Sequence, residues 1–296
     1  MPKSSPFTGV LTAIVTPFTA DGGLDLDALA RHVEAQIAGG VDGLVPCGTT
    51  GENVTLTPDE QAKVVRRVVE VAKKRVAVVA GAGSNNTADS IAKARASREA
   101  GADGIMLVAP YYNKPSQDGM VAHFSAVIRE VPLPTVLYNV PGRTSSDILP
   151  ETVARLAALP EVVAIKEATG SMVRASQILA RCGDAITLLS GDDFTAYPAM
   201  AVGARGLISV ASNVAPRWLA DLWGAVKTGA WDKARLMHHK IQPLTEILFA
   251  DPSPAPAKAA LAMMGLMRED VRLPLIPLDD AAKARLRAQL QKDGLV

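Results

Sequence analysis

Short apolar runs alternate with longer amphipathic segments from residue 10 to residue 227 of the chain. The short runs are rich in β-branched residues and almost wholly apolar, as expected of strands buried on both faces of a parallel sheet. They predict strands at residues 10–16, 43–46, 76–80, 104–109, 135–139, 162–166, 186–190 and 206–209. The longer segments predict helices at residues 25–39, 58–73, 87–100, 117–130, 148–158, 171–182, 193–202 and 215–227.

Residues that favour helix starts support these boundaries. Thr57 is followed by a proline and two acids, and Asn86 and Ser116 stand just before two further helices. Regular alternation of strands and helices over this length is typical of a (β/α)8 TIM barrel. The alternative, a doubly wound open sheet, favours a GxGxxG turn, and the run 81–86 lacks the third glycine. We therefore expect an α/β TIM barrel over residues 1–229.

Beyond residue 229 the strand pattern stops. A segment of this length can bury little core by itself. We therefore expect residues 230–296 to form a C-terminal helical extension that packs on the barrel or on a neighbouring subunit, so that the chain is one structural domain overall. Its predicted helices are 231–250, 254–267 and 279–291, separated by proline-rich breaks at 252–256 and 274–277.

The composition is that of a soluble globular protein, with 48% hydrophobic residues, 21% charged residues and a net charge of +1. This charge balance gives no indication of nucleic-acid binding. Cys47 and Cys182 form no CxxC pair, which argues against a disulfide framework and suits a reducing compartment. No apolar run approaches the ~18 residues of a membrane span. We expect a cytoplasmic protein that binds no membrane.

Polar residues gather at the carboxyl ends of the predicted strands, where TIM barrels carry their active sites. Lys166 ends the apolar strand 162–166. One interpretation is a lysine whose ammonium reaches water beside an apolar stem. The other is a Schiff-base lysine, because an amine with a pKa near ~10.4 becomes nucleophilic when desolvation favours its neutral form. The second interpretation predicts covalent chemistry on a substrate carbonyl group.

Other strand ends supply groups that such chemistry needs. Tyr138, Thr49 and Thr50 carry hydroxyls that could relay protons, and the Gly-Thr-Thr-Gly run could hold a carboxylate through its N–H groups. The alternatives are a core tyrosine and a capped turn. Arg143 could bind a substrate carboxylate in a bidentate manner, or it could form a surface ion pair with Asp147.

Five segments, in this order and spacing, resemble those of the dihydrodipicolinate synthases (4-hydroxy-tetrahydrodipicolinate synthases), a family of pyruvate-dependent class I aldolases. The likeness extends over essentially the whole chain. The segments are Gly-Thr-Thr-Gly-Glu at 48–52, Tyr-Tyr-Asn-Lys-Pro at 111–115, Tyr-Asn-Val-Pro-Gly-Arg-Thr at 138–144, Ile-Lys-Glu-Ala-Thr at 165–169 and Ser-Gly-Asp-Asp at 190–193.

The resemblance implies a lyase that condenses pyruvate with L-aspartate 4-semialdehyde in lysine and diaminopimelate biosynthesis. Lys166 would form the imine with pyruvate, with no metal or organic cofactor. Tyr138, Thr49 and Tyr112 would form the proton relay, and Tyr112 would reach in from an adjacent subunit. The family is usually a homotetramer built from two tight dimers.

The resemblance also implies the substrate-binding residues. Thr50 would hold the pyruvate carboxylate, and Arg143 would receive the carboxylate of the semialdehyde. Gly191 and Ile208 would line the pocket through their backbones. The serine pair 145–146 departs from the glycine that is usual after Arg-Thr in this loop.

Three alternatives remain open at the level of sequence. Another pyruvate-releasing class I aldolase, acting on N-acetylneuraminate, 4-hydroxy-2-oxoglutarate or a sugar acid, would share Lys166 and Tyr138 but generally lacks an arginine at the position of Arg143. A catalytically inactive sensor would be expected to lose the lysine or the hydroxyls, and both are present. A metal-dependent aldolase is disfavoured because the four histidines are scattered or adjacent on one helix.

Overall fold

Eight parallel strands close into a barrel in the computed structural model, which describes residues 5–296. Each strand pairs with the next one along the chain, and the last pairs with the first. The predicted TIM barrel is therefore confirmed, its residues 1–4 lying outside the described part, and the open doubly wound sheet is wrong. The strands are β1 (Gly9–Thr12), β2 (Gly43–Leu44), β3 (Ala77–Gly81), β4 (Gly104–Val108), β5 (Thr135–Asn139), β6 (Val162–Glu167), β7 (Thr187–Ser190) and β8 (Gly206–Ser209).

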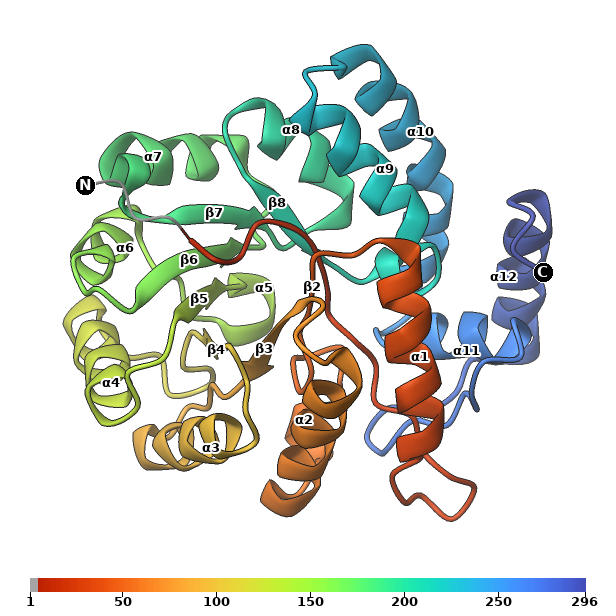
Figure 1. Cartoon of the computed structure of the whole chain (residues 1–296), viewed down its shortest axis with the longest axis horizontal. Coiled ribbons are helices and arrows are strands. Elements are labelled where there is room, and N and C mark those ends of the chain that lie inside the picture. The colour runs from red at the N-terminus through yellow and green to blue at the C-terminus, as the bar shows by residue number, and fades with distance from the viewer. Residues whose placement is uncertain (1–4) are drawn as a thin grey trace.

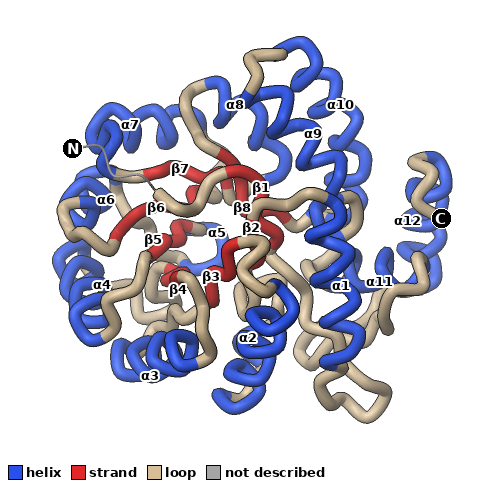
Figure 2. Tube along the Cα trace, in the orientation of Figure 1, coloured by secondary structure: helices blue, strands red, loops and turns tan. Residues whose placement is uncertain are grey.

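Helices surround the strands, as Figures 1 and 2 show, and α10 to α12 continue the chain at one side of the barrel. The helices are α1 (Leu26–Gly39), α2 (Pro58–Ala72), α3 (Thr87–Glu99), α4 (Gln117–Glu130), α5 (Pro141–Thr144), α6 (Pro150–Ala157), α7 (Met172–Cys182), α8 (Ala196–Ala201), α9 (Pro216–Lys227), α10 (Trp231–Leu248), α11 (Ala255–Met263) and α12 (Asp280–Lys292). Short 3-10 helices are η1 (Asn53–Thr55), η2 (Gly183–Ala185), η3 (Asp193–Thr195) and η4 (Ala211–Asn213).

The predicted helix starts are confirmed by their caps. Thr57 and Glu60 form a reciprocal capping box at the start of α2, in which each side chain accepts the other residue's backbone N–H. The side chains of Asn86 and Ser116 accept N–H groups in the first turns of α3 and α4. These bonds satisfy donors that the helix itself leaves unpaired.

The strands separate two apolar cores. Side chains that alternate along each strand point either into the barrel or out toward the helices. The inner core contains Val136 of β5, Ala164 of β6, Leu189 of β7 and Ile208 of β8. The neighbouring residues of the same strands, such as Ile165, belong to the larger outer core beneath the helices.

The C-terminal helices are packed onto the barrel. Helix α10 lies against α9, and α11 contacts η4 and α12. Leu244 and Leu248 of α10 and Ala260 and Leu261 of α11 are fully buried and belong to the same outer core as the barrel helices. The extension therefore shares its apolar core with the barrel.

Some predicted boundaries were wrong. The segment 193–202 is η3 followed by α8, because the buried carboxylate of Asp193 is bound by Ser209 and by the N–H groups that follow β8. Residues 141–144, read as a loop, form the one-turn helix α5 with Pro141 at its start. Helix α11 ends at Met263 rather than at residue 267, since Gly265 turns the chain with a left-handed φ of 74°.

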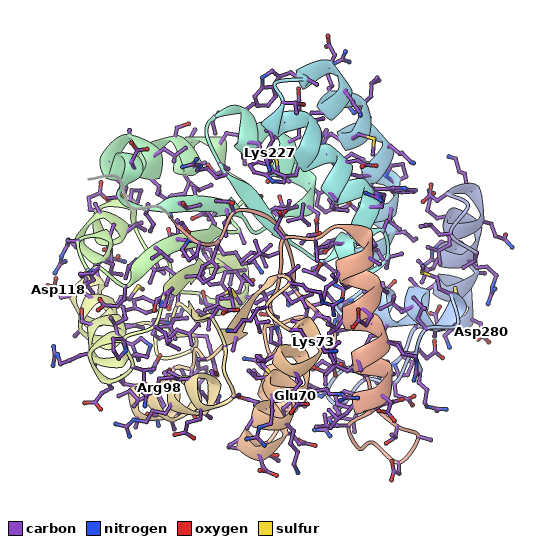
Figure 3. All side chains as sticks on the ribbon, viewed as in Figure 1. Glu70, Lys73, Arg98, Asp118, Lys227 and Asp280 are labelled. Atoms are coloured by element: carbon purple, nitrogen blue, oxygen red, sulfur yellow. The ribbon has the colours of Figure 1, made fainter. Side chains whose placement is uncertain are left out.

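Charged side chains of both signs project from helices around the outside of the molecule. Figure 3 labels examples on this surface: Glu70, Lys73, Arg98, Asp118, Lys227 and Asp280. None of the helices within residues 5–296 is both long and apolar enough to cross a membrane.

Candidate active site

Lys166 lies inside the barrel near the carboxyl end of β6. It follows the inner-core residue Ala164 by two positions, and Tyr138 on β5 follows Val136 in the same way. Lys166 and Tyr138 are direct neighbours in the register of β5 and β6. Their side chains are each 5% exposed, and the Lys166 Nζ lies 4.2 Å from the centroid of the Tyr138 ring. The structure therefore brings the amine of Lys166 to the face of the Tyr138 ring.

Gly191 follows β7 and makes room for the Lys166 side chain. A Cβ atom at this glycine would lie 2.9 Å from Cγ of Lys166, 3.0 Å from its Cε and 2.7 Å from Cβ of Ala168. The Gly191 N–H donates to the carbonyl of Glu167 at 2.7 Å, which fixes the glycine against β6. Only glycine lets the backbone approach the lysine stem this closely.

The Thr49–Thr50 turn follows β2. Gly51 donates its N–H to the carbonyl of Gly48, and Glu52 donates to that of Thr49, so the turn closes on itself. Within residues 5–296 no intramolecular hydrogen bond engages the N–H of Thr49 or Thr50. These two groups are therefore available to an anionic ligand. Thr50 is 5% exposed.

The ends of β5 and β6 are braced by a polar network. The amide of Asn139 donates to Asp147 at 2.9 Å and to Glu167 at 3.0 Å. Arg174 of α7 binds both oxygens of Asp147, at 2.6 and 2.8 Å, and so lowers the pKa of that carboxyl. Glu167 in turn accepts the N–H of Thr169. The backbone on both sides of Tyr138 and Lys166 is thereby held in place.

Arg143 is exposed on α5 and lines the cavity that opens at this end of the barrel. The alternative in which it pairs with Asp147 is wrong, because Arg174 holds that carboxylate. The guanidinium of Arg143 therefore faces the cavity without an ion pair to a carboxylate in the described part of the chain.

The cavity has a volume of about 770 Å³, including its opening to solvent. Of the predicted site residues, Thr49, Tyr138 and Arg143 line it, whereas Lys166, Thr50, Gly191 and Ile208 are not among its lining residues. Most of the other residues that line the cavity were not predicted from the sequence. The full set of these other lining residues is Cys47, Gly48, Asn53, Val54, Gly81, Gly83, Met106, Val108, Tyr111, Val140 and Thr144.

Gly81 and Gly83 lie where two backbone segments approach each other closely. A Cβ at Gly81 would lie 2.1 Å from the carbonyl oxygen of Cys47, and one at Gly83 would lie 2.4 Å from the N–H nitrogen of Val108. Two glycines spaced in this way, at the end of a strand and just beyond it, indicate close backbone contact. Here that contact shapes one wall of the cavity.

Cys47 is the one thiol that borders the cavity among the described residues. It is fully buried, and burial raises the pKa of its thiol to about 12. Its Sγ points to the carbonyl of Gln61 at 3.7 Å. Because a thiolate is the nucleophilic form, this cysteine is a packing residue rather than a reactive one.

Tyr112 is not brought to the site within one subunit. Its side chain is 88% exposed, its φ is 71°, and its N–H donates to the carbonyl of Thr144 at the end of α5. Tyr112 is therefore not among the residues that line the cavity.

Metal-ligating side chains do not cluster in the described part of the chain: no group of three or more His, Cys, Asp or Glu residues there could hold a metal ion.

The fold and the site together define a TIM-barrel enzyme with a buried lysine at the mouth of the barrel, beside a tyrosine. The chain belongs to the Dihydrodipicolinate synthetase family, whose sequence profile matches residues 6–293. It is an enzyme of the lyase class.

Relatives match nearly the whole length of the chain. It is 51% identical to the 4-hydroxy-tetrahydrodipicolinate synthase of Geobacter sulfurreducens, over 98% of this chain and 100% of that protein. A dihydrodipicolinate synthase of Acinetobacter baumannii, solved with pyruvate, superimposes with a TM-score of 0.96 at 40% identity, over 98% of this chain and 99% of that one. A monomeric dihydrodipicolinate synthase variant matches with a TM-score of 0.96 at 39% identity, over 98% of each chain.

Proposed function

We propose that the chain condenses pyruvate with L-aspartate 4-semialdehyde to 4-hydroxy-tetrahydrodipicolinate, a step of lysine and diaminopimelate biosynthesis. The observation that carries this proposal is the position of Lys166. It is buried at 5% exposure on the inner barrel face, with Nζ at 4.2 Å from the ring centroid of Tyr138. Desolvated lysines of this kind form Schiff bases.

The amine of Lys166 adds to the ketone carbon of pyruvate, and water leaves to give the imine. Loss of a methyl proton gives an enamine, whose carbon attacks the aldehyde of the second substrate. The amino group of that substrate then displaces Lys166 and closes the ring. Tyr138, Thr49 and Tyr112 relay the protons, and Tyr112 acts from an adjacent subunit, in keeping with its 88% exposure.

Substrate binding follows from the same loops. Thr50 holds the pyruvate carboxylate through its hydroxyl and through the N–H groups of the turn, and the relative solved with pyruvate supports a pyruvate site in this fold. Arg143 receives the carboxylate of the semialdehyde at the cavity entrance. Gly191 and Ile208 line the pocket. The lysine–pyruvate imine takes the place of a metal or organic cofactor.

We further propose a homotetramer of two tight dimers in the cytoplasm, each chain forming one structural domain from a barrel (1–229) and an extension (230–296). The exposed Tyr112 supports a subunit contact, and so does the existence of a relative distinguished as a monomeric variant. The two free cysteines suit a reducing compartment. The shared apolar core supports one domain.

Borohydride reduction in the presence of pyruvate, followed by peptide mass mapping, tests the proposal. One covalent adduct is expected at Lys166, and none in a Lys166→Ala protein. An adduct elsewhere, or no adduct, would contradict the assignment. Full activity in the presence of a chelator is also expected.

The competing reading is another pyruvate-releasing aldolase. Arg143 at the cavity entrance argues for a second substrate that carries a short carboxylate arm. Purified enzyme is offered pyruvate with aspartate semialdehyde and, separately, N-acetylneuraminate or 4-hydroxy-2-oxoglutarate. Turnover confined to the latter two would replace the proposed reaction.

A further inference from the structure

A buried ion pair joins the C-terminal extension to the loop that follows β2. The Nζ of Lys258 in α11 lies 2.7 Å from Oε1 of Glu52, and the two side chains are 0% and 1% exposed. The other oxygen, Oε2, accepts the backbone N–H of Arg272 at 2.9 Å. Residues more than 200 positions away in the sequence thus hold both oxygens of the Glu52 carboxylate.

In these buried surroundings, each charge of the pair depends on the other for its stabilisation. The Nζ of Lys258 lies 4.1 Å from the ring centroid of Phe18, and the guanidinium carbon of Arg272 lies 4.4 Å from it. Burial lowers the pKa of Lys258, and the charge of Glu52 opposes that effect. Removal of one partner would leave the other charge buried and uncompensated.

Arg272 also binds residues that follow Glu52 in the chain. Its guanidinium binds both oxygens of Glu60, at 2.5 and 2.8 Å, and donates to the carbonyl of Thr55 at 2.9 Å. Glu52 stands immediately before η1, and Thr55 ends it. The extension therefore holds this short helix at both ends.

Glu52 connects these contacts to the site. It has a left-handed φ of 54°, which a non-glycine residue keeps only when its surroundings impose it. Its N–H donates to the carbonyl of Thr49, and Asn53 and Val54 line the cavity beside Thr49. The backbone conformation of Glu52 therefore determines the conformation of the Thr49–Thr50 turn.

We propose that Lys258 and Glu52 are positioning residues for pyruvate: their buried pair keeps the Thr49–Thr50 turn in the conformation that receives the substrate carboxylate. Neither side chain touches the substrate. The C-terminal extension is thus part of the catalytic apparatus and not only a cover for the barrel. This inference rests on the proposed pyruvate site at Thr50.

Steady-state kinetics with both substrates test the inference. In Lys258→Met the KM for pyruvate should rise about 10-fold, because a turn displaced by a fraction of an ångström misplaces its N–H groups. The KM for aspartate semialdehyde should change less than about twofold, since Arg143 belongs to α5 and has no contact with this pair. General destabilisation would instead lower kcat with the folded fraction and leave both KM values unchanged, and that result would overturn the inference.

The double variant Glu52→Gln/Lys258→Met removes both buried charges while it keeps an acceptor for the Arg272 N–H, so it should fold even where the single variant does not. A rise of at least about threefold in its pyruvate KM is expected, and an unchanged KM would refute the inference. The matched control is Lys283→Met, which removes a half-buried lysine of the same extension that pairs with Glu269; its pyruvate KM should match wild type.

Borohydride mapping separates this inference from the proposed function. If pyruvate labels wild-type enzyme at Lys166 but the Lys258 variants show no selective rise in the pyruvate KM, only the positioning role fails. If wild-type enzyme does not label at Lys166, the Schiff-base proposal fails, whatever the Lys258 variants do.

Discussion

The ammonium nitrogen of Lys166 lies 4.2 Å from the centroid of the Tyr138 ring because the two residues are paired in register on β6 and β5. Both side chains stand two positions beyond inner-core residues, Ala164 and Val136, so strand alternation points both into the barrel. Their separation is therefore fixed by the hydrogen-bonded sheet. Catalytic groups placed on strands are held more accurately than groups placed on loops.

Tyr138→Phe keeps the ring beside Lys166 and removes only the hydroxyl. The proton transfers of imine formation lose their relay, so kcat should fall by about 10²- to 10³-fold. The melting temperature should stay close to wild type, because the buried ring is retained. Coupled-assay rates and thermal unfolding measure the two effects. A variant with normal kcat would remove Tyr138 from the relay.

Gly191→Ala places a methyl group 2.9 Å from Cγ of Lys166 and 3.0 Å from its Cε. The lysine must shift, so borohydride trapping of pyruvate should slow by about 10²-fold. Gly224→Ala on α9 is the control, because a Cβ there meets no atom within 4 Å and alanine favours a helix. Equal trapping rates in the two variants would show that Gly191 does not govern the position of the lysine.

Arg143→Ala removes the cationic group at the cavity entrance. A lost charge-assisted, bidentate contact should raise the KM for aspartate semialdehyde by about 10- to 100-fold. The rate of borohydride labelling with pyruvate alone should not change, since the proposed pyruvate site at Lys166 and Thr50 does not include Arg143. Loss of pyruvate labelling would assign Arg143 to the first substrate instead.

The position of Lys166 could be predicted from sequence because its cause is local. An apolar run that ends in a lysine, within a regular series of strands and helices, places that lysine at the barrel mouth. The same reasoning found Tyr138, Thr49 and Thr50, which lie at or just beyond the ends of β5 and β2. Helix starts could be predicted equally well, since each capping side chain lies within three residues of the N–H group that it binds.

The remaining parts of the site depend on contacts between distant segments. Glu52 stands in the Gly-Thr-Thr-Gly-Glu segment, but its carboxylate is bound to Lys258, 206 residues away. The ion pair of Asp147 with Arg174, which leaves Arg143 facing the cavity, is likewise a contact between separate segments, the loop before α6 and helix α7. Periodicity along the chain carries no information about such pairings, because it reports only which face of an element is buried.

Ser145 occupies a backbone conformation that suits glycine, with φ of 54° and ψ of 20° after α5. Ser145→Gly relieves this left-handed strain, which is partly offset by the greater freedom of glycine in the unfolded chain. A gain of about 0.5–1 kcal/mol in the free energy of unfolding is expected. Ser146→Gly is the control: this buried neighbour has no positive φ, so its variant should be less stable than wild type. Urea unfolding measures both, and a destabilised Ser145→Gly protein would contradict the reading.

His32 of α1 is 1% exposed, and its Nε2 lies 3.0 Å from Oδ1 of Asn213. Its Nδ1 has no hydrogen-bond partner in the described part of the chain. Burial lowers the pKa of His32 to about 4 from the ordinary value of 6.5. Since the unfolded chain binds this proton more readily, the contribution of His32 to stability is intact above pH 6.5 and is lost as the pH falls from 6.5 toward 4.

His32→Gln replaces the titrating ring with an amide that can still donate to Asn213. Between pH 7.5 and pH 5 the variant should lose about 2 kcal/mol less unfolding free energy than wild type, because its buried group takes up no proton in either state. The control is His239→Gln, which changes an exposed histidine and should follow the wild-type pH dependence. Urea unfolding of the three proteins at the two pH values gives one difference in unfolding free energy for each protein. If His32→Gln and wild type lose the same free energy in acid, the buried imidazole is not what makes this fold acid-sensitive.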